Sequence, residues 1–310
     1  MPMSAAPALP DLTRRPRRAE RVVVGVLFAC AAVSVGVTIA IIAVLLFETL
    51  DFFRDVDVFS FLTGTKWRLL GDREGDYGVL PLLGGTAMIG VGALVVGLPL
   101  GLATAIYLAE YARPRVRAVL KPTLELLAGI PTVVIGFFAL NVITPTILRP
   151  LFGDDRVFIF NAASGAIAVG LMVLPLIASI SEDAIRAVPQ SLREASYGLG
   201  ASKRVTALRV VVPAALSGIA ASVLLALSRA VGETMAVTIA TGNTPRLTVN
   251  YFESIQTLTA HIANTVTGEA AAGTTRYQSL FAVGATLFVI TLGMNMVSNA
   301  IVRRFRQEYQ

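Results

Sequence analysis

The chain has 310 residues, of which 55% are hydrophobic and only 15% are charged. Soluble domains carry about 25% charged residues, and here the apolar residues form long blocks, which favours a membrane protein over a soluble domain. The basic residues that give the net charge of +6 lie in positions typical of cytoplasmic membrane loops, so we expect no nucleic-acid partner. The single cysteine, Cys30, and the single histidine, His261, exclude an internal disulfide and a multi-histidine metal site.

Residues 1–21 are polar and basic and predict a disordered tail. The apolar block that follows, 22–47, is longer than the roughly 7–15 residues of a cleavable signal and has no small-residue cleavage pattern after it. We therefore interpret it as an uncleaved first transmembrane helix.

Five further apolar blocks follow, and each is long enough to cross about 30 Å of hydrocarbon at about 1.5 Å per residue. The sequence therefore predicts an all-α membrane protein with one transmembrane domain, 22–305, after the tail. The six predicted transmembrane helices are 22–47, 80–109, 123–148, 161–181, 213–240 and 277–301. Glycines 97 and 101, spaced as GxxxG, predict close helix packing, and Pro131 and Pro175 predict helix kinks.

Six spans put both termini on one side, and the basic residues indicate which side. Seventeen of the 26 Lys and Arg residues lie in the tail, the loops 110–121 and 182–212 and the C-terminus, whereas eight lie in the longer intervening loops. Because basic residues concentrate in cytoplasmic loops, both termini are expected inside. The long last outer segment, 241–276, is expected to hold His261 in a solvated loop without a special role.

Two charged residues, Arg229 and Glu233, fall within the predicted span 213–240. A charge at the bilayer centre costs about 2.5–3.5 kcal/mol on insertion scales, so such residues are usually functional. On a continuous helix their i,i+4 spacing places them on one face, close enough to pair. We predict that Arg229 attracts an anionic substrate and that Glu233 moderates this attraction. A structural ion pair and a proton relay are the alternatives, and Glu125 is a further candidate for the pathway or a gate.

The loop 182–212 is too polar to lie in lipid and too regular for a random linker. Ser191 and Glu194 match an S-x-x-E capping box directly after Pro189, which predicts a helix start at Ser191. Gly198 and Gly200 are suited to end the helix. The result is a short surface helix that fits a groove on another protein. Its predicted contact face consists of Leu192, Ala195, Ser196 and Leu199.

These residues also resemble the loop signature of ATP-binding-cassette importer permeases. That signature reads Glu-Ala-Ala, three residues, Gly, nine residues, Ile, one residue, Leu-Pro, and here it is matched by Glu194, Ala195, Ser196, Gly200, Val210, Val212 and Pro213. Serine replaces the second alanine and valines replace Ile and Leu, with the spacing intact. The resemblance implies that this segment, which also includes Ser191, docks on an ATPase subunit and transmits its closure to the membrane helices.

The resemblance extends to about residues 22–305. The strings KPTLELLAGIPTVVIGFFAL, SISEDAI, ALSRAVGETMAV, TLTAHIA and RYQSLFA resemble the phosphate-specific importer permeases, and the acidic segment after the first span is more similar to their C-type than to their A-type subunit. This implies a type I importer fold in the inner membrane of a bacterium and inorganic phosphate as substrate. It also implies a heterodimer with a sibling permease, two copies of an ATP-binding subunit and an extracytoplasmic phosphate-binding protein.

The chain contains no Gly-Lys dipeptide and therefore no GxxxxGK[ST] phosphate-binding loop. We expect it to be a transporter subunit and not an enzyme, with no cofactor of its own and with ATP and Mg on the partner ATPase. Three rival functions remain at this point: a proton-coupled carrier that uses Glu233, a non-transporting membrane scaffold or sensor, and an importer for another oxyanion such as sulfate or molybdate.

Overall fold

The computed structural model describes residues 18–70, 74–268 and 273–305, and its chain divides into two compact units, Met1–Phe47 and Glu48–Gln310. The first unit is the apolar part of helix α1 (Arg18–Asp55), whose side chains up to Phe47 are almost all exposed. The prediction of a disordered tail over residues 1–21 is wrong at its end, because α1 begins at Arg18. The acidic Glu20 lies in the first turn of α1, where the helix dipole favours a negative charge. Residues 1–17 of the expected tail lie outside the described residues.

The second unit begins with a small aromatic cluster. After α1 ends, Asp57 caps the short helix α2 (Val58–Thr63) by accepting a hydrogen bond from the Ser60 amide at 2.8 Å. Strands β1 (Trp67–Leu70) and β2 (Glu74–Tyr77) then form an antiparallel hairpin with Trp67 opposite Tyr77. This hairpin is an unexpected addition to a helical fold. The core of the aromatic cluster is formed by Phe52, Phe61, Trp67 and Tyr77, whose rings meet edge to face.

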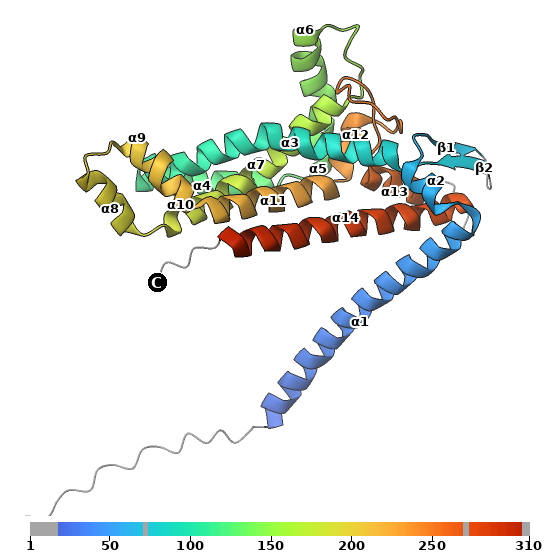
Figure 1. The fold of residues 1–310 in the computed structure, drawn as a ribbon, viewed down its shortest axis with the longest axis horizontal. Coiled ribbons are helices and arrows are strands. Elements are labelled where there is room, and N and C mark those ends of the chain that lie inside the picture. Colours follow the sequence, from blue (N-terminus) through green and yellow to red (C-terminus); the bar gives the residue numbers. More distant parts are fainter. Residues whose placement is uncertain (1–17, 71–73, 269–272, 306–310) are drawn as a thin grey trace, which may run out of the picture. The chain divides into compact units, whose positions relative to one another are not determined.

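The centre of the second unit is a pair of long helices that lie side by side (Figure 1). Helix α3 (Leu80–Ile106) continues into the π-helical turn η1 (Tyr107–Tyr111) and packs along α7 (Ala162–Ala187). The predicted GxxxG motif lies at this contact. A Cβ atom on Gly97 would come within 2.8 Å of the Gly170 carbonyl oxygen, and one on Gly101 within 2.9 Å of Ile177 Cβ. The glycines therefore allow the close approach of the two helices.

The expected third span, 123–148, is divided in the structure. Helix α4 (Pro114–Ala128) ends at Gly129, and a separate helical segment starts after Pro131. That segment runs through α5 (Thr132–Phe138), the π-helical η2 (Ala139–Leu148) and α6 (Arg149–Phe152). The kink predicted at Pro131 is a complete break in the structure, because proline has no N–H to continue the ladder and disfavours helical backbone in the residue before it. The predicted start of this span at residue 123 is therefore wrong.

The expected fifth span, 213–240, is interrupted twice. Helix α8 (Gln190–Gly198) is followed by α9 (Lys203–Val205), η3 (Thr206–Val211) and α10 (Val212–Ala214), and the chain then bends by 69° before α11 (Leu216–Gly232). A second break at Glu233, whose backbone is extended, precedes α12 (Met235–Thr241). The prediction of a single continuous helix over 213–240 is therefore wrong.

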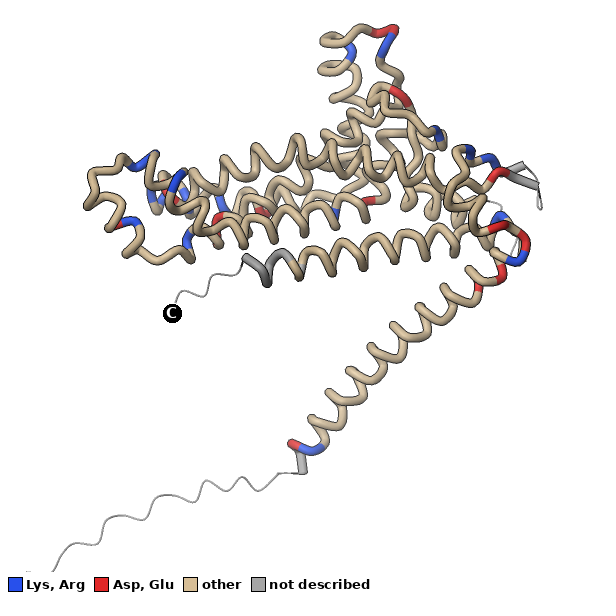
Figure 2. The backbone as a smooth tube through the Cα atoms, in the orientation of Figure 1, with Lys and Arg blue, Asp and Glu red and all other residues tan. Residues whose placement is uncertain are grey.

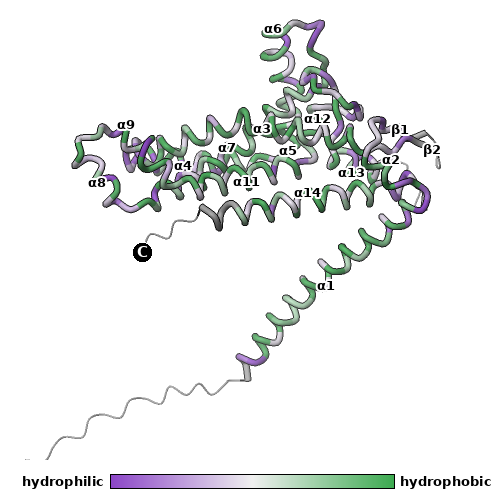
Figure 3. The backbone as a smooth tube through the Cα atoms, viewed as in Figure 1, coloured by the Kyte–Doolittle hydropathy of each residue, from purple (hydrophilic) through white to green (hydrophobic). Residues whose placement is uncertain are grey.

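Two helices complete the second unit, α13 (Leu258–Thr267) and α14 (Thr275–Phe305). Five helices in the described residues are long and apolar enough to cross a membrane, or six when the bent pair 203–214 and 216–232 counts as one span. Charged residues of the second unit gather at the ends of its long helices (Figure 2), and the segments between them are mostly hydrophobic (Figure 3). This confirms an all-α membrane protein by class.

Candidate functional site: a clamped surface helix and a broken membrane helix

Helix α8 begins differently from the sequence prediction. It starts at Gln190 with Pro189 in the N-cap position, and no side chain caps it. Ser191 is therefore the second helical residue and cannot act as the N-cap of a capping box with Glu194, which corrects that prediction. The extended backbone of Pro189 (φ −58°, ψ 140°) sets the turn into the helix instead. Gly200 follows the end of α8 with φ +80°, a left-handed conformation that glycine adopts without strain.

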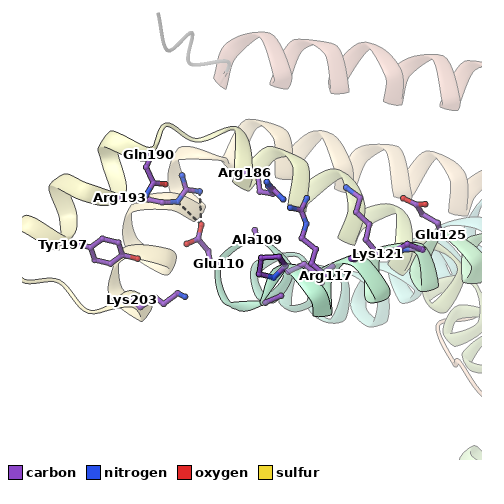
Figure 4. A pocket seen from close by; sticks show the side chains of 15 residues that line it. Ala109, Glu110, Arg117, Lys121, Glu125, Arg186, Gln190, Arg193, Tyr197 and Lys203 are labelled. Carbon is purple, nitrogen blue, oxygen red and sulfur yellow. Dashed lines mark hydrogen bonds and ion pairs between the residues drawn. The ribbon is translucent and has the colours of Figure 1, made fainter.

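A buried arginine clamps α8 to the ends of two long helices (Figure 4). Arg193 Nε and Nη2 donate to Glu110 Oε1 of η1 at 3.1 and 2.9 Å, and their side chains are only 11% and 5% exposed. Arg193 also donates to the carbonyl oxygens of Ile185 (2.8 Å) and Val188 (2.5 Å), at the end of α7. The planar guanidinium therefore satisfies three acceptors from two elements at once. The sequence analysis did not assign a role to Arg193 or Glu110.

The opposite face of α8 is open to solvent. Ser196, predicted to belong to the contact face, turns inward and hydrogen-bonds Thr206 at 2.9 Å, which corrects that part of the prediction. Glu194 and Ala195 are exposed, and Leu199 is 89% exposed. Pro213, on α10, is also exposed. The described residues therefore present a short, rigidly held helix whose outer face is free for another protein.

A second charge cluster ties α4 to α7. Glu182 is fully buried, and both of its oxygens are paired: Arg117 Nη2 lies 2.6 Å from Oε1 and Lys121 Nζ lies 2.7 Å from Oε2. Lys121 also meets Asp183 at 2.8 Å. Burial by itself lowers the pKa of Lys121, but its hydrogen bonds to Asp183 and Glu182 raise it above the usual value. The only sequence signal was the presence of Lys121 and Glu182 in two of the family-like strings.

Arg117 and Lys121 of this cluster line a pocket of about 880 Å³ between α4, η1 and α8 (Figure 4). Glu125, predicted for the substrate pathway, lies on α4 and lines this pocket. The structure records no contact between Glu125 and either Arg229 or Glu233. The polar and charged side chains of the lining are those of Glu110, Arg117, Lys121, Glu125, Arg186, Gln190, Arg193, Tyr197 and Lys203.

Arg229 and Glu233 flank a break between two helices. Arg229 is exposed in the last turn of α11, and Glu233 follows that helix with an extended backbone. Glu233 Oε1 accepts a hydrogen bond from the Ala236 amide at 3.2 Å in the first turn of α12. Because the helix ends at Gly232, the expected i,i+4 face does not form, and the described residues contain no ion pair between these two side chains. The prediction that Arg229 and Glu233 lie on one helix face and pair is therefore wrong, and the two charges lie on either side of the break.

The break is held in place by a neighbouring helix. Thr259 of α13 donates a hydrogen bond to the carbonyl oxygen of Glu233 at 2.8 Å. Each charge also suits its helix end, since a cation is favourable near the C-terminus of α11 and a carboxylate near the N-terminus of α12. In membrane proteins, non-helical backbone of this kind is tolerated only where protein or a water-lined cavity surrounds it. Arg229 is exposed beside this break and makes no ion pair with any of the described residues.

A multi-span helical bundle with a clamped surface helix at one end and a broken, charged helix within it defines a membrane permease component. The model of the family described as binding-protein-dependent transport system inner membrane component matches residues 97–307, so the chain belongs to this family. The computed fold is similar to chains of a bacterial alginate transporter (TM-score 0.64, 14% identity, 94% of this chain and 98% of that chain) and of the MetNI methionine transporter (TM-score 0.54, 19% identity, 74% and 95%).

Curated relatives match over most of their length. The chain is 36% identical over 265 residues to the probable ABC transporter permease protein YqgH of Bacillus subtilis, covering 85% of this chain and 84% of the relative. It is 35% identical over 262 residues to the phosphate transport system permease protein PstC of Mesorhizobium japonicum, covering 79% of each. It is also 33% identical over 225 residues to PstA 1 of Mycobacterium tuberculosis, covering 72% of this chain and 69% of the relative. The expected type I importer permease fold is thereby confirmed.

Proposed function

We propose that the chain is the C-type permease subunit of an ATP-driven importer of inorganic phosphate. The support is its similarity to several proteins described as phosphate transport system permease protein PstC, together with the single unpaired arginine beside a helix break. It works in the inner membrane as a heterodimer with a sibling permease. Two ATP-binding subunits and an extracytoplasmic phosphate-binding protein complete the transporter, and both termini lie inside.

The open face of α8 is the docking surface for one ATPase subunit, which binds ATP and Mg. Its contact residues include Glu194, Ala195 and the turn at Gly200, all exposed beside the clamped face. When the ATPase pair closes, it moves α8, and the Arg193 clamp passes that motion to the end of α3 through Glu110 and to the end of α7 through two carbonyls. A rigid helix clamped at its base transmits force better than a flexible loop.

At the helix break, Arg229 attracts the phosphate anion and Glu233 limits how long it stays. A charge-assisted hydrogen bond contributes about 1.5–3 kcal/mol, which is enough to select an anion without trapping it. Glu233 also holds the start of α12 through the Ala236 amide, so it positions the break while its negative charge faces the same region. Glu125 belongs to the pocket beside α8, where it contributes to the inner gate. ATP binding and hydrolysis alternate the bundle between two states with different access.

The decisive variant is Arg229→Gln in the assembled transporter. The assay uses proteoliposomes that hold this chain, the sibling permease, the ATPase subunits and the binding protein, with ATP inside. Labelled-phosphate uptake is expected to fall by about tenfold or more, because one charge-assisted contact is lost. Assembly with the ATPase is expected to persist. Arg54→Gln is the matched control, because the Arg54 side chain is 79% exposed and, among the described residues, its only ion pair is with Asp51 at the surface.

Three results would each overturn a part of the proposal. Uptake that continues without ATP and stops with an uncoupler identifies a proton-coupled carrier, in which Glu233 acts in proton transfer. Unchanged uptake in Arg229→Gln removes the pathway role of that residue, and stronger competition by sulfate or molybdate than by phosphate assigns another oxyanion as substrate.

A further inference from the structure

A second polar pocket lies at the end of the second unit opposite α8, between β1, α13 and the start of α14 (Figure 1). It has a volume of about 670 Å³. The described lining contains two arginines, several neutral hydrogen-bonding groups and no carboxylate. Its residues are Trp67, Arg68, Asn243, Pro245, Gln256, His261, Asn264, Thr265 and Arg276.

Two hydrogen-bond donors in this lining lack a protein partner among the described residues. Trp67 is 4% exposed, and its indole Nε1 has no acceptor. Arg276 Nε is also buried and has no acceptor. An unsatisfied buried group costs about 1–3 kcal/mol, and native proteins leave few of them, so each calls for an explanation. Both groups are donors, and the oxygens of a bound anion are acceptors of the kind that would satisfy them.

The electrostatics of the pocket also favour an anion. Arg276 is the second residue of α14, where the helix dipole is unfavourable for a cation. Burial and the charge of Arg276 lower the pKa of His261 to about 4, so His261 is neutral at pH 7 and adds no positive charge. A neighbouring groove shares Trp67 and Arg68 with this pocket and adds Lys66 and Arg246. Of these four cations only Arg246 has an ion pair in the described residues, with Glu253 at 3.9 Å, so the two arginines of the pocket itself, Arg68 and Arg276, have no carboxylate partner there.

The pocket is connected to the helix break by α13. That helix contributes His261, Asn264 and Thr265 to the pocket, and its Thr259 holds the Glu233 carbonyl. Asn264 donates to Asn243, in the segment after α12, at 2.6 Å. The same short helix therefore lines the pocket at one point and supports the break at another.

We propose that this pocket is a second anion site, in which Arg276, Arg68 and the Trp67 indole N–H bind a tetrahedral oxyanion, inorganic phosphate, before it reaches Arg229. The choice of phosphate rests on the proposed function, and the anion class rests on the pocket itself. Guanidinium groups bind phosphate oxygens in pairs of parallel hydrogen bonds, and a neutral indole donor adds selectivity without extra charge.

Trp67 is the only tryptophan of the chain, so its fluorescence reports on this pocket directly. The purified full chain in nanodiscs is titrated with potassium phosphate against potassium chloride at equal ionic strength. A saturable change with phosphate alone is expected. Arg276→Gln is expected to weaken the apparent affinity by about tenfold, in line with one lost charge-assisted contact. Arg246→Gln, which removes the same charge from outside the pocket, is expected to leave the affinity unchanged.

Two controls separate this proposal from folding effects and from the proposed function. Arg276→Lys keeps the charge at the start of α14 and is expected to recover part of the affinity that Arg276→Gln loses. This recovery would show that the loss in Arg276→Gln comes from the missing charge. Arg229→Gln is expected to keep the fluorescence titration while it loses uptake. The pocket proposal is refuted if phosphate gives no saturable change beyond chloride, or if Arg276→Gln and Arg246→Gln behave alike. A saturable phosphate signal in a chain that supports no ATP-driven uptake refutes the transport proposal alone.

Discussion

His261 shows how a single residue can be misplaced by sequence reasoning. A lone histidine in a polar segment between two apolar blocks predicts a solvated loop. In the structure its side chain is 2% exposed on α13, its ring meets Trp67 edge to face at 4.8 Å, and Thr265 lies within hydrogen-bond distance at 3.3 Å. The expectation was wrong because its partner Trp67 lies far away in sequence, on a hairpin that no local pattern indicated.

The buried histidine makes the stability of the chain depend on pH. Because the pKa of His261 is lowered from 6.5 to about 4 in the folded protein, the unfolded state binds more protons between these values. His261 therefore reduces stability progressively as the pH falls from 6.5 to 4, by about 3 kcal/mol in total. The thermal unfolding midpoint, followed by Trp67 fluorescence at pH 7.5 and pH 4.5, is expected to fall less in His261→Phe than in the wild type.

The comparison between the two proteins isolates the histidine, because carboxylates titrate in both. His261→Phe keeps a ring against Trp67 and removes the titrating group. Parallel decreases of the midpoint in the two proteins would show that His261 is protonated as easily when folded as when unfolded, and the assigned pKa direction would be wrong.

Among the elements, α8 is hydrogen-bonded to η1 and to the end of α7 through one side chain, that of Arg193. Arg193→Lys keeps a positive charge but cannot reach Glu110 and both α7 carbonyls at once, since an ammonium group lacks the planar fork. Burying a charge with fewer partners is also costly. The variant is expected to assemble and hydrolyse ATP while moving several-fold less phosphate for each ATP consumed. The ratio of labelled phosphate taken up to ATP hydrolysed measures this coupling.

Arg204→Lys is the matched control, because Arg204 is an exposed residue on the adjacent α9. It is expected to leave the ratio unchanged. If Arg193→Lys lowers uptake and hydrolysis by the same factor, α8 docks less well on the ATPase, and the clamp does not transmit the motion.

The elements that the sequence predicts well are those with a strong local signal. Long apolar blocks predict the candidate spans, and the polar loop with regular spacing predicts a short surface helix near residue 190. Breaks are harder to place, because Pro131 indicates a kink in one apolar block, whereas Gly232 ends α11 inside another without any change in hydropathy. The Glu182 cluster needs α4 and α7 to lie together, which no local pattern determines. Arg229 and Glu233 were chosen from their charge alone, and their role as pathway residues stays a prediction.

At the scale of the whole molecule, the number of membrane crossings depends on the bent pair of helical segments before α12. Five helices of the described residues are long and apolar enough to span it, and the bent pair before α12 is either a sixth span or a re-entrant segment. The basic residues predict both termini inside, and with six spans the segments at Asp155 and Val249 lie outside. With a re-entrant pair, Val249 lies on the opposite side from Asp155, because one crossing is lost between them.

Cysteine labelling in spheroplasts distinguishes these arrangements. Single cysteines at Asp155, Lys203 and Val249, in a Cys30→Ser background, occupy exposed positions after α6, on α9 and after α12, respectively. A membrane-impermeant maleimide is expected to label Asp155→Cys and Val249→Cys in intact spheroplasts, and Lys203→Cys only after permeabilisation. The protection of Lys203→Cys is expected because Arg186, Arg193, Arg204 and Arg209 lie around position 203, and basic loops are retained inside. Labelling of Lys203→Cys alone would invert the topology, whereas joint protection of Lys203→Cys and Val249→Cys would make the bent pair re-entrant and place Arg229 in a loop that returns to its own side.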